Sequence, residues 1–176
     1  MAAFTIDMSS PISSGFTKHH GGPGAGGHDP KDKWYIAFGM DLGAPAGTNV
    51  FAAFDGHVTV FNPDRRTPPG SKQFGAEIFV RSSNNMMGGF YTHVGDVPSA
   101  VIKGAPITRG DRLGQIKTFV PPHVHFALVE IIGGAPGGRY AGVKNLLSTF
   151  VSISNTSSVI QVTFNQNGTP PTVSGP

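Results

Sequence analysis

Residues 121–130 read PPHVHFALVE, and this stretch decides how the chain is interpreted. An apolar run of this length, bounded by prolines, is typical of a buried β-strand. In a strand, residues i and i+2 project from the same face, so His123 and His125 point one way, about 6–7 Å apart along the strand. One imidazole is then available to a metal ion and the other to a proton. Alone, the pattern also fits two histidines on a solvated surface.

Similar runs recur along the chain and define the fold class. The 176 residues suffice for one domain, and 25 Gly and 15 Pro indicate many turns. One segment, 142–151, has spacing that favours a short helix. We therefore expect a mainly β domain of antiparallel sheets. The predicted strands are 50–61, 74–81, 89–94, 112–118, 123–130 and 159–164.

Composition excludes several classes of protein. The chain has no cysteine, so any metal site must use histidines and carboxylates. A net charge of +3, with only 13% charged residues, argues against a nucleic-acid partner. No apolar run reaches the roughly 18 residues of a membrane span, and the first residues lack the layout of a secretory signal peptide.

Two segments are expected to lack regular structure. Residues 9–33 are rich in Gly, Pro and Ser and include HHGGPGAGGH at 19–28, which predicts a long surface loop. Residues 165–176 have little to bury and predict a flexible tail. The domain then spans residues 1–164, with a C-terminal extension from about residue 140.

Other polar residues interrupt apolar segments. Asp41 lies within FGMDL (38–42), where a buried carboxylate needs a charged partner or a metal. His93 ends the run that contains Tyr91. Each is also compatible with a structural role, as a turn aspartate or a surface histidine.

The order of these segments is more specific than any one of them. Residues 39–58, 91–93, 110–116 and 123–126 together resemble the lysostaphin-type (LytM, M23) zinc metallopeptidases, over about two thirds of the chain. The resemblance implies a β-sheet with an open groove and Zn²⁺ at its floor. It also implies cleavage of peptide cross-links in bacterial peptidoglycan, in the periplasm or at the cell wall.

The resemblance assigns roles residue by residue. Asp41 and His125 match metal ligands, while His93 and His123 match the histidines that assist catalysis. Tyr91 is then a candidate for substrate contact.

One position departs from the family pattern. Ala37 stands four residues before Asp41, where the family has its first zinc-binding histidine. A methyl group cannot bind zinc, so we expect weak or absent zinc and an impaired enzyme. Three explanations are open: a natural non-catalytic member, an engineered substitution, or replacement by His19, His20 or His28. Ordering a Gly-rich loop costs entropy, so we place replacement last and expect these three histidines to be exposed loop residues.

Two other functions compete with an enzyme. The same groove could bind a wall peptide or a partner protein without hydrolysis, as a regulatory module. Alternatively, the domain could be carried by a delivery machine such as a phage tail, with the segment from about residue 140 as a docking surface.

Overall fold

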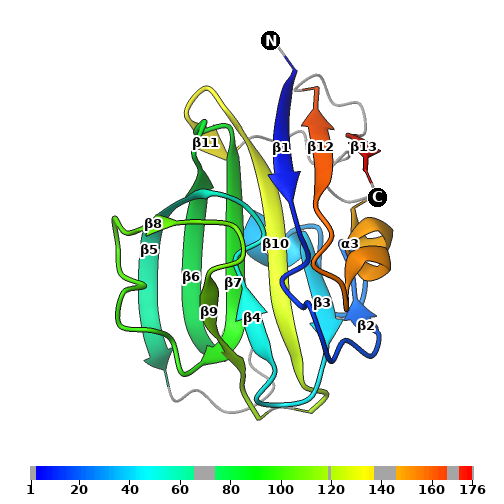
Figure 1. The fold of residues 1–176 in the computed structure, drawn as a ribbon, viewed down its shortest axis with the longest axis vertical. Coiled ribbons are helices and arrows are strands. Elements are labelled where there is room, and N and C mark those ends of the chain that lie inside the picture. The colour runs from blue at the N-terminus through cyan, green and yellow to red at the C-terminus, as the bar shows by residue number, and fades with distance from the viewer. Residues whose placement is uncertain (1–2, 66–73, 119, 137–145, 166–170, 176) are drawn as a thin grey trace.

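The computed structural model describes residues 3–65, 74–118, 120–136, 146–165 and 171–175. It confirms a mainly β fold of open antiparallel sheets (Figure 1). The helices are α1 (Trp34–Ala37) and α3 (Leu147–Ile153). The strands are β1 (Phe4–Met8), β2 (His19–Gly21), β3 (Gly39–Gly43), β4 (Asn49–Phe51), β5 (Gly56–Arg65), β6 (Gly75–Ser82), β7 (Met87–Gly95), β8 (Pro106–Ile107), β9 (Arg112–Ile116), β10 (His123–Ile132), β11 (Ala135–Pro136), β12 (Ile160–Phe164) and β13 (Thr172–Ser174).

The larger sheet has strand order β2-β3-β10-β7-β6-β5-β8, with β4, β9 and β11 attached to it. β10 lies between β3 and β7 and is antiparallel to both. Nine of its ten residues are buried, because both faces of the sheet are covered. This explains why its sequence is apolar almost throughout. β10 is therefore a rigid central strand on which site residues can be placed.

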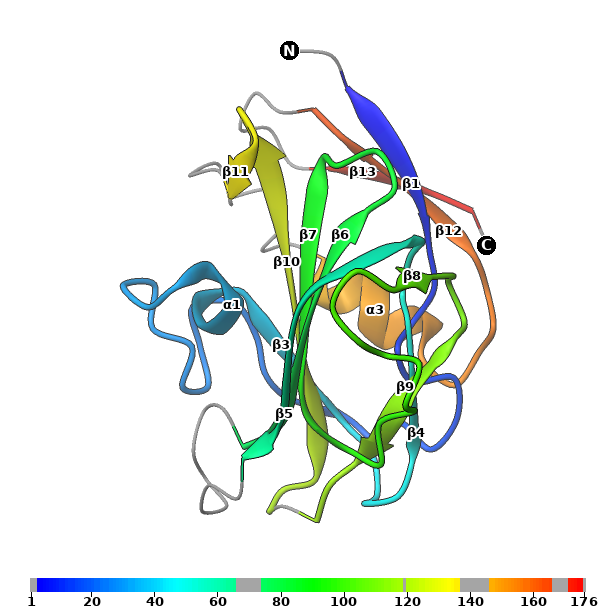
Figure 2. The same cartoon turned by 90° about the vertical axis from the view of Figure 1, so that its left-hand side faces the viewer.

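The two faces of this sheet have different neighbours. Figure 2 shows α1 and the loop before it on one face, and β4, β9 and α3 on the other. Val124, Phe126 and Leu128 belong to the main core on the second side. Ala127 belongs to a small aromatic cluster beside α1. The alternation along β10 thus directs His123 and His125 toward the α1 face.

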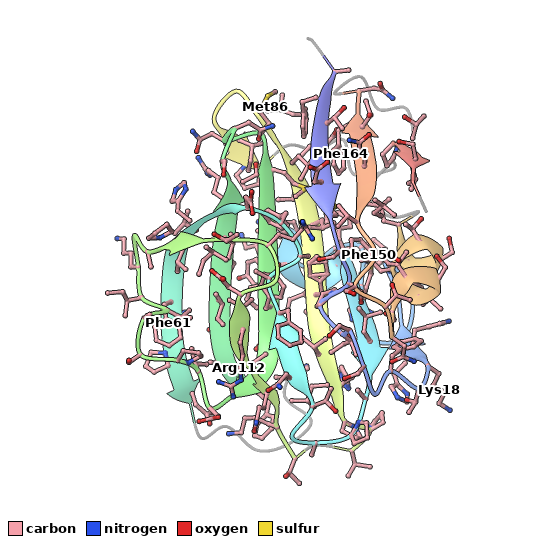
Figure 3. The ribbon with its side chains drawn as sticks, viewed as in Figure 1. Lys18, Phe61, Met86, Arg112, Phe150 and Phe164 are labelled. Carbon is pink, nitrogen blue, oxygen red and sulfur yellow. The ribbon has the colours of Figure 1, made fainter. Side chains whose placement is uncertain are left out.

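A second sheet, of order β1-β12-β13, carries both ends of the chain. Phe4 of β1 stacks on Phe164 of β12, with ring centroids 5.0 Å apart. Figure 3 shows Phe150 extending from α3 toward β10, where its ring meets Phe126 edge-on at 5.2 Å. The segment after residue 146 therefore packs on the main core. Its use as a docking surface stays a prediction.

Several element boundaries differ from those expected. The predicted strand 50–61 is two strands, because β4 pairs with β9 whereas β5 pairs with β6 and β8. Residues 19–21, expected in a loop, form β2 on the edge of β3. Residues 172–174, expected in the flexible tail, form β13 on β12. In both cases an exposed strand edge supplies backbone hydrogen bonds to a segment whose side chains give no strand signal.

The predicted helix also begins later than expected. α3 starts at Leu147, and residues 142–145 lie outside the described part of the chain. None of the helices described in the structure is long and apolar enough to cross a membrane.

Candidate metal centre

The centre is built on the pairing of β3 with β10. In this antiparallel ladder His125 lies directly opposite Asp41, and His125 Nδ1 is 3.1 Å from Asp41 Oδ1. Gly39 lies on the same face of β3 as Asp41, and a Cβ at Gly39 would overlap the His125 ring. A glycine at this position therefore makes the space in which the imidazole turns toward the carboxylate.

His28 joins this pair from the loop between β2 and α1. Its side chain is buried, and its Nε2 lies 3.2 Å from Asp41 Oδ1 and 3.3 Å from His125 Nδ1. The expectation that His28 is an exposed loop residue is therefore wrong. His19 is exposed as expected, whereas His20 is half-buried, with its ring 6.0 Å from that of His123.

The loop is shaped by glycines and by backbone hydrogen bonds. β2 places Gly21 opposite Asp41, and Gly26 returns to within contact of Gly21 with a φ of 61°. A Cβ at Gly26 would lie 2.7 Å from the Gly21 Cα, so the backbone at Gly26 approaches the backbone at Gly21 too closely for a side chain. Gly24 N–H donates to the carbonyl of Ala37 at 3.2 Å, which ties the loop to α1. These contacts bring His28 over Asp41.

Four imidazoles of the centre share one feature: one ring nitrogen of each lies against a backbone carbonyl. A carbonyl only accepts, so that nitrogen carries the proton, and the other nitrogen of the neutral ring is an acceptor. The pairs are His28 Nδ1 with Ala25 O (2.6 Å), His125 Nε2 with Tyr35 O (2.6 Å), His93 Nδ1 with Phe74 O (2.8 Å) and His123 Nδ1 with Pro121 O (2.6 Å).

This tautomer pattern places three acceptors together. His28 Nε2, His125 Nδ1 and Asp41 Oδ1 all lie within 4.8 Å of one another, and all three residues are buried. Such a set repels itself unless a proton or a metal cation lies among its lone pairs. Two imidazoles and one carboxylate, each imidazole held by a second partner, are donors suited to Zn²⁺. The residues present therefore fit the metal that the family resemblance implies.

The electrostatics of the centre follow from burial and mutual proximity. Burial alone would raise the pKa of Asp41, but the close approach of the His125 and His28 ring nitrogens, which donate to the carboxylate whenever they carry a proton, holds it well below its usual range. Burial opposes the charged form of His28, yet the contact with Asp41 raises its pKa above the ordinary value. Positive charge is therefore favoured beside the carboxylate.

A bulge in β7 directs His93 into the same centre. Ala76 pairs with Val94 and Ile78 with Tyr91, so β7 carries an extra residue opposite β6 at this point. His93 has a φ of 67°, which turns its side chain away from the face that holds Tyr91. Burial and the neighbouring imidazoles lower the pKa of His93 to about 3, which keeps its ring neutral.

His123 completes the group of residues expected in the site. Its ring meets that of His93 edge-on, with centroids 4.9 Å apart, and its Nε2 is 3.7 Å from Asp41 Oδ1. Burial lowers the pKa of His123. The structure thus brings Asp41, His93, His123 and His125 together, as predicted, and adds His28.

Two other residues singled out in the sequence lie outside this group. Tyr91 is fully buried in the main core, where its hydroxyl accepts a hydrogen bond from Ala53 N–H at 3.0 Å. Substrate cannot reach it, so its prediction as a contact residue is wrong. Ala37 is 1% exposed and packs with Phe38, Phe90 and Ala127.

His28 is the residue that sequence reasoning ranked lowest, since replacement of the missing ligand by a loop histidine was placed last. It lies thirteen positions before Asp41, instead of the four that the family spacing suggested. The available signal was a histidine at the end of a glycine-rich segment on the same side of Asp41 as the missing ligand. Nothing in that segment revealed its path, because the path depends on pairing with β3.

Comparisons with known proteins bear on this fold. The model of peptidase family M23 matches residues 35–136, more than half of the chain, and this region begins after His28. No curated protein matches the sequence significantly.

Solved structures are similar to this chain at low identity. Helicobacter pylori Csd3 has a TM-score of 0.53 and 17% identity, over 74% of this chain and 33% of its own. A zinc-containing peptidase from Vibrio cholerae has a TM-score of 0.49 and 21% identity, and the match covers 73% of this chain and 37% of that protein. A third structure is a point mutant of the catalytic domain of the prophage-encoded M23 protein EnpA from Enterococcus faecalis. It has a TM-score of 0.48 and 19% identity, and the match covers 73% of this chain and 91% of that domain. The chain spans about a third of the length of the first two. With the family model matched across its central strands, the chain belongs to peptidase family M23.

Proposed function

We propose that this chain is a zinc metallopeptidase that cleaves peptide bonds of bacterial peptidoglycan, with His28, Asp41 and His125 as the ligands. The observation that carries the proposal is the buried set of three acceptors within 4.8 Å of one another. Three protein ligands leave one position of a tetrahedral ion open, as in catalytic zinc sites. Family membership supports the substrate class, which places the action at the cell wall or in the periplasm.

The proposal changes the role expected for Ala37. A two-ligand site follows from the sequence only if no loop histidine enters it. The burial of His28, and its 3.2 Å approach to Asp41 Oδ1, support a complete ligand set without a side chain at position 37. We therefore propose an active enzyme in place of an impaired one.

The chain's own residues divide the work in this proposal. When bound, zinc would polarise the scissile carbonyl and lower the pKa of a water molecule toward about 7. The carbonyls of Ala25 and Tyr35 hold the ligand imidazoles in the tautomers that face Asp41. His93 and His123 donate Nδ1–H to backbone carbonyls, so Nε2 of each is the atom that takes up and returns a proton.

The test measures zinc and peptide release together. Purified peptidoglycan and a glycine-rich peptide are incubated with the zinc-loaded chain, and new amino groups are counted. We expect release that stops on chelation and returns with zinc. His123→Ala should lower kcat by about 10²–10⁴-fold at unchanged zinc content, the usual contribution of a general acid–base group. His57→Ala, a half-buried histidine on β5 outside the centre, is the matched control.

A different result would favour the non-catalytic module. If the chain binds one zinc and is retained on insoluble peptidoglycan, yet releases no amino groups, the peptidase proposal is wrong. The same groove would then serve for recognition alone.

A further inference from the structure

We propose that a groove on the α1 face, at the end of β6 and β7 away from the metal centre, binds a carboxylate-bearing segment of the peptide substrate. The inference rests on the proposed peptidase function and adds a specificity site to it. The groove has a volume of about 150 Å³, and its lining combines aromatic and aliphatic side chains with two glycines, one threonine and Arg81, the charged residue among them.

The floor and walls of the groove come from four elements. Trp34 of α1, Phe79 of β6 and Ile131 of β10 provide apolar walls. Gly88 of β7 keeps the floor open, because a Cβ there would lie 3.1 Å from Val129 Cγ1 and 3.8 Å from Trp34 Cη2. A pocket with such walls takes an apolar side chain or a flat stretch of peptide.

A continuous row of rings joins this groove to the metal centre. The Trp34 and Phe79 rings meet edge-on with centroids 6.2 Å apart, and Phe79 lies 4.5 Å from Phe90. Phe90 in turn meets the ring of the ligand His125 at 5.8 Å. Along β7, His93 lies four positions after Gly89, which corresponds to about 13 Å at about 3.3 Å per residue. An extended peptide of about four residues would therefore reach from one site to the other.

The charge of the groove selects the kind of peptide. Arg81 shares a face of β6 with Phe79 and is half-buried at the groove. Its cross-strand neighbours are His57 and Gly88, and no ion pair links it to an acidic side chain among the residues that the structure describes. A guanidinium in this position favours a carboxylate, which it binds through two parallel N–H donors. A single cation beside apolar walls suits an acidic peptide better than a polyanion, which needs a row of cations.

The chain supplies its own probe for the experiment, because Trp34 is the only tryptophan. Its fluorescence is recorded while the chelator-treated, uncleaving protein is titrated with the peptide Ac-Ala-Leu-Ala-Glu-NH₂. The matched peptide, with Gln in place of Glu, differs only in charge. We expect a saturable change with both peptides and about three- to tenfold tighter binding of the Glu peptide, as for a partly desolvated ion pair. The preference should weaken as salt is added.

Substitution of Arg81 then tests the assignment. In Arg81→Gln the two peptides should bind equally, whereas Arg81→Lys should keep part of the preference. An unchanged far-ultraviolet circular dichroism spectrum and unchanged Trp34 fluorescence of the free protein would verify the fold of each variant. The inference is overturned if no saturable change occurs, or if Arg81→Gln keeps the full preference for Glu.

The outcomes separate this inference from the proposed function. Peptide binding is measured without catalysis, so it can succeed even if no peptidoglycan is cleaved. Conversely, if the zinc-loaded chain cleaves peptidoglycan and Arg81→Gln leaves kcat/KM unchanged for acidic and neutral peptides, the peptidase stands and the groove assignment fails.

Discussion

Asp41 and His125 are placed by strands, whereas His28 is placed by a loop. The first two face each other in the ladder of β3 and β10, where the register fixes which side chains meet. His28 depends on a glycine turn, on hydrogen bonds from its backbone and ring to the carbonyl of Ala25, and on the edge strand β2. A period of two residues can be recognised in a sequence, but the course of a glycine-rich loop cannot.

The largest effect should come from Asp41, because its carboxylate contacts both the strand residue His125 and the loop residue His28. Asp41→Asn keeps the size of the side chain but removes the anion on which the imidazoles converge. We expect zinc affinity to fall by more than about 100-fold, beyond the 10–100-fold typical of outer-shell partners, with peptidoglycan cleavage lost. Asp29→Asn, at an exposed acid of the same loop as His28, should leave both unchanged. Equal losses in the two variants would contradict the assignment.

Acid should destabilise the metal-free protein through the strand-borne histidines. The pKa of His93 falls from 6.5 to about 3 on burial, so between these values the unfolded chain binds a proton that the folded chain does not. The free energy of unfolding therefore decreases as the pH falls through this window, by about 2–3 kcal/mol at pH 4.5. His123, whose pKa is also lowered, acts in the same direction. His28, whose pKa is raised, is protonated in both states below pH 6.5 and adds no slope.

Urea unfolding at several pH values in the presence of chelator checks this expectation. His93→Gln should flatten the dependence on pH. A profile as steep in that variant as in the wild type would show that other groups dominate.

Ala37→His tests whether the family spacing or the loop supplies the third ligand. Because Ala37 is packed among Phe38, Phe90 and Ala127, we expect a loss of about 1–3 kcal/mol in the free energy of unfolding, from overpacking, and no gain in zinc affinity. Denaturant unfolding and zinc titration measure the two quantities, with Ala37→Ser as a small control. A tighter zinc site in the histidine variant would place position 37 in the centre.

How far the site could be predicted is clearest in β7. His93 and Tyr91 were both expected at the site, and in a regular strand residues two apart share one face. The bulge at His93 separates them, so one enters the metal centre and the other the main core. The pair His123 and His125 was predictable because β10 is regular. His28 was not, because its position depends on backbone pairing between β2 and β3 that the side chains of residues 19–28 do not reveal.

The smallest expected effect is a local change in the loop on metal removal. In the proposed site, chelation would remove an ion that links His28 to the strands, so amides of residues 22–28 should exchange hydrogen about 10–100-fold faster. Amides in the middle of β10, bonded on both sides, should not change. Hydrogen exchange followed by mass spectrometry compares the two regions. Equal acceleration in both would mean that the ion stabilises the whole domain and does not act mainly on the loop.

The central claim is that the loop completes the metal centre, and zinc binding by His28→Ala tests it most directly. The comparison is His19→Ala, which removes an exposed histidine of the same segment. We predict about one zinc per chain and wild-type affinity for His19→Ala, and an affinity more than about 100-fold weaker for the folded His28→Ala protein. Wild-type zinc content and affinity in His28→Ala would contradict the account and return the centre to two protein ligands.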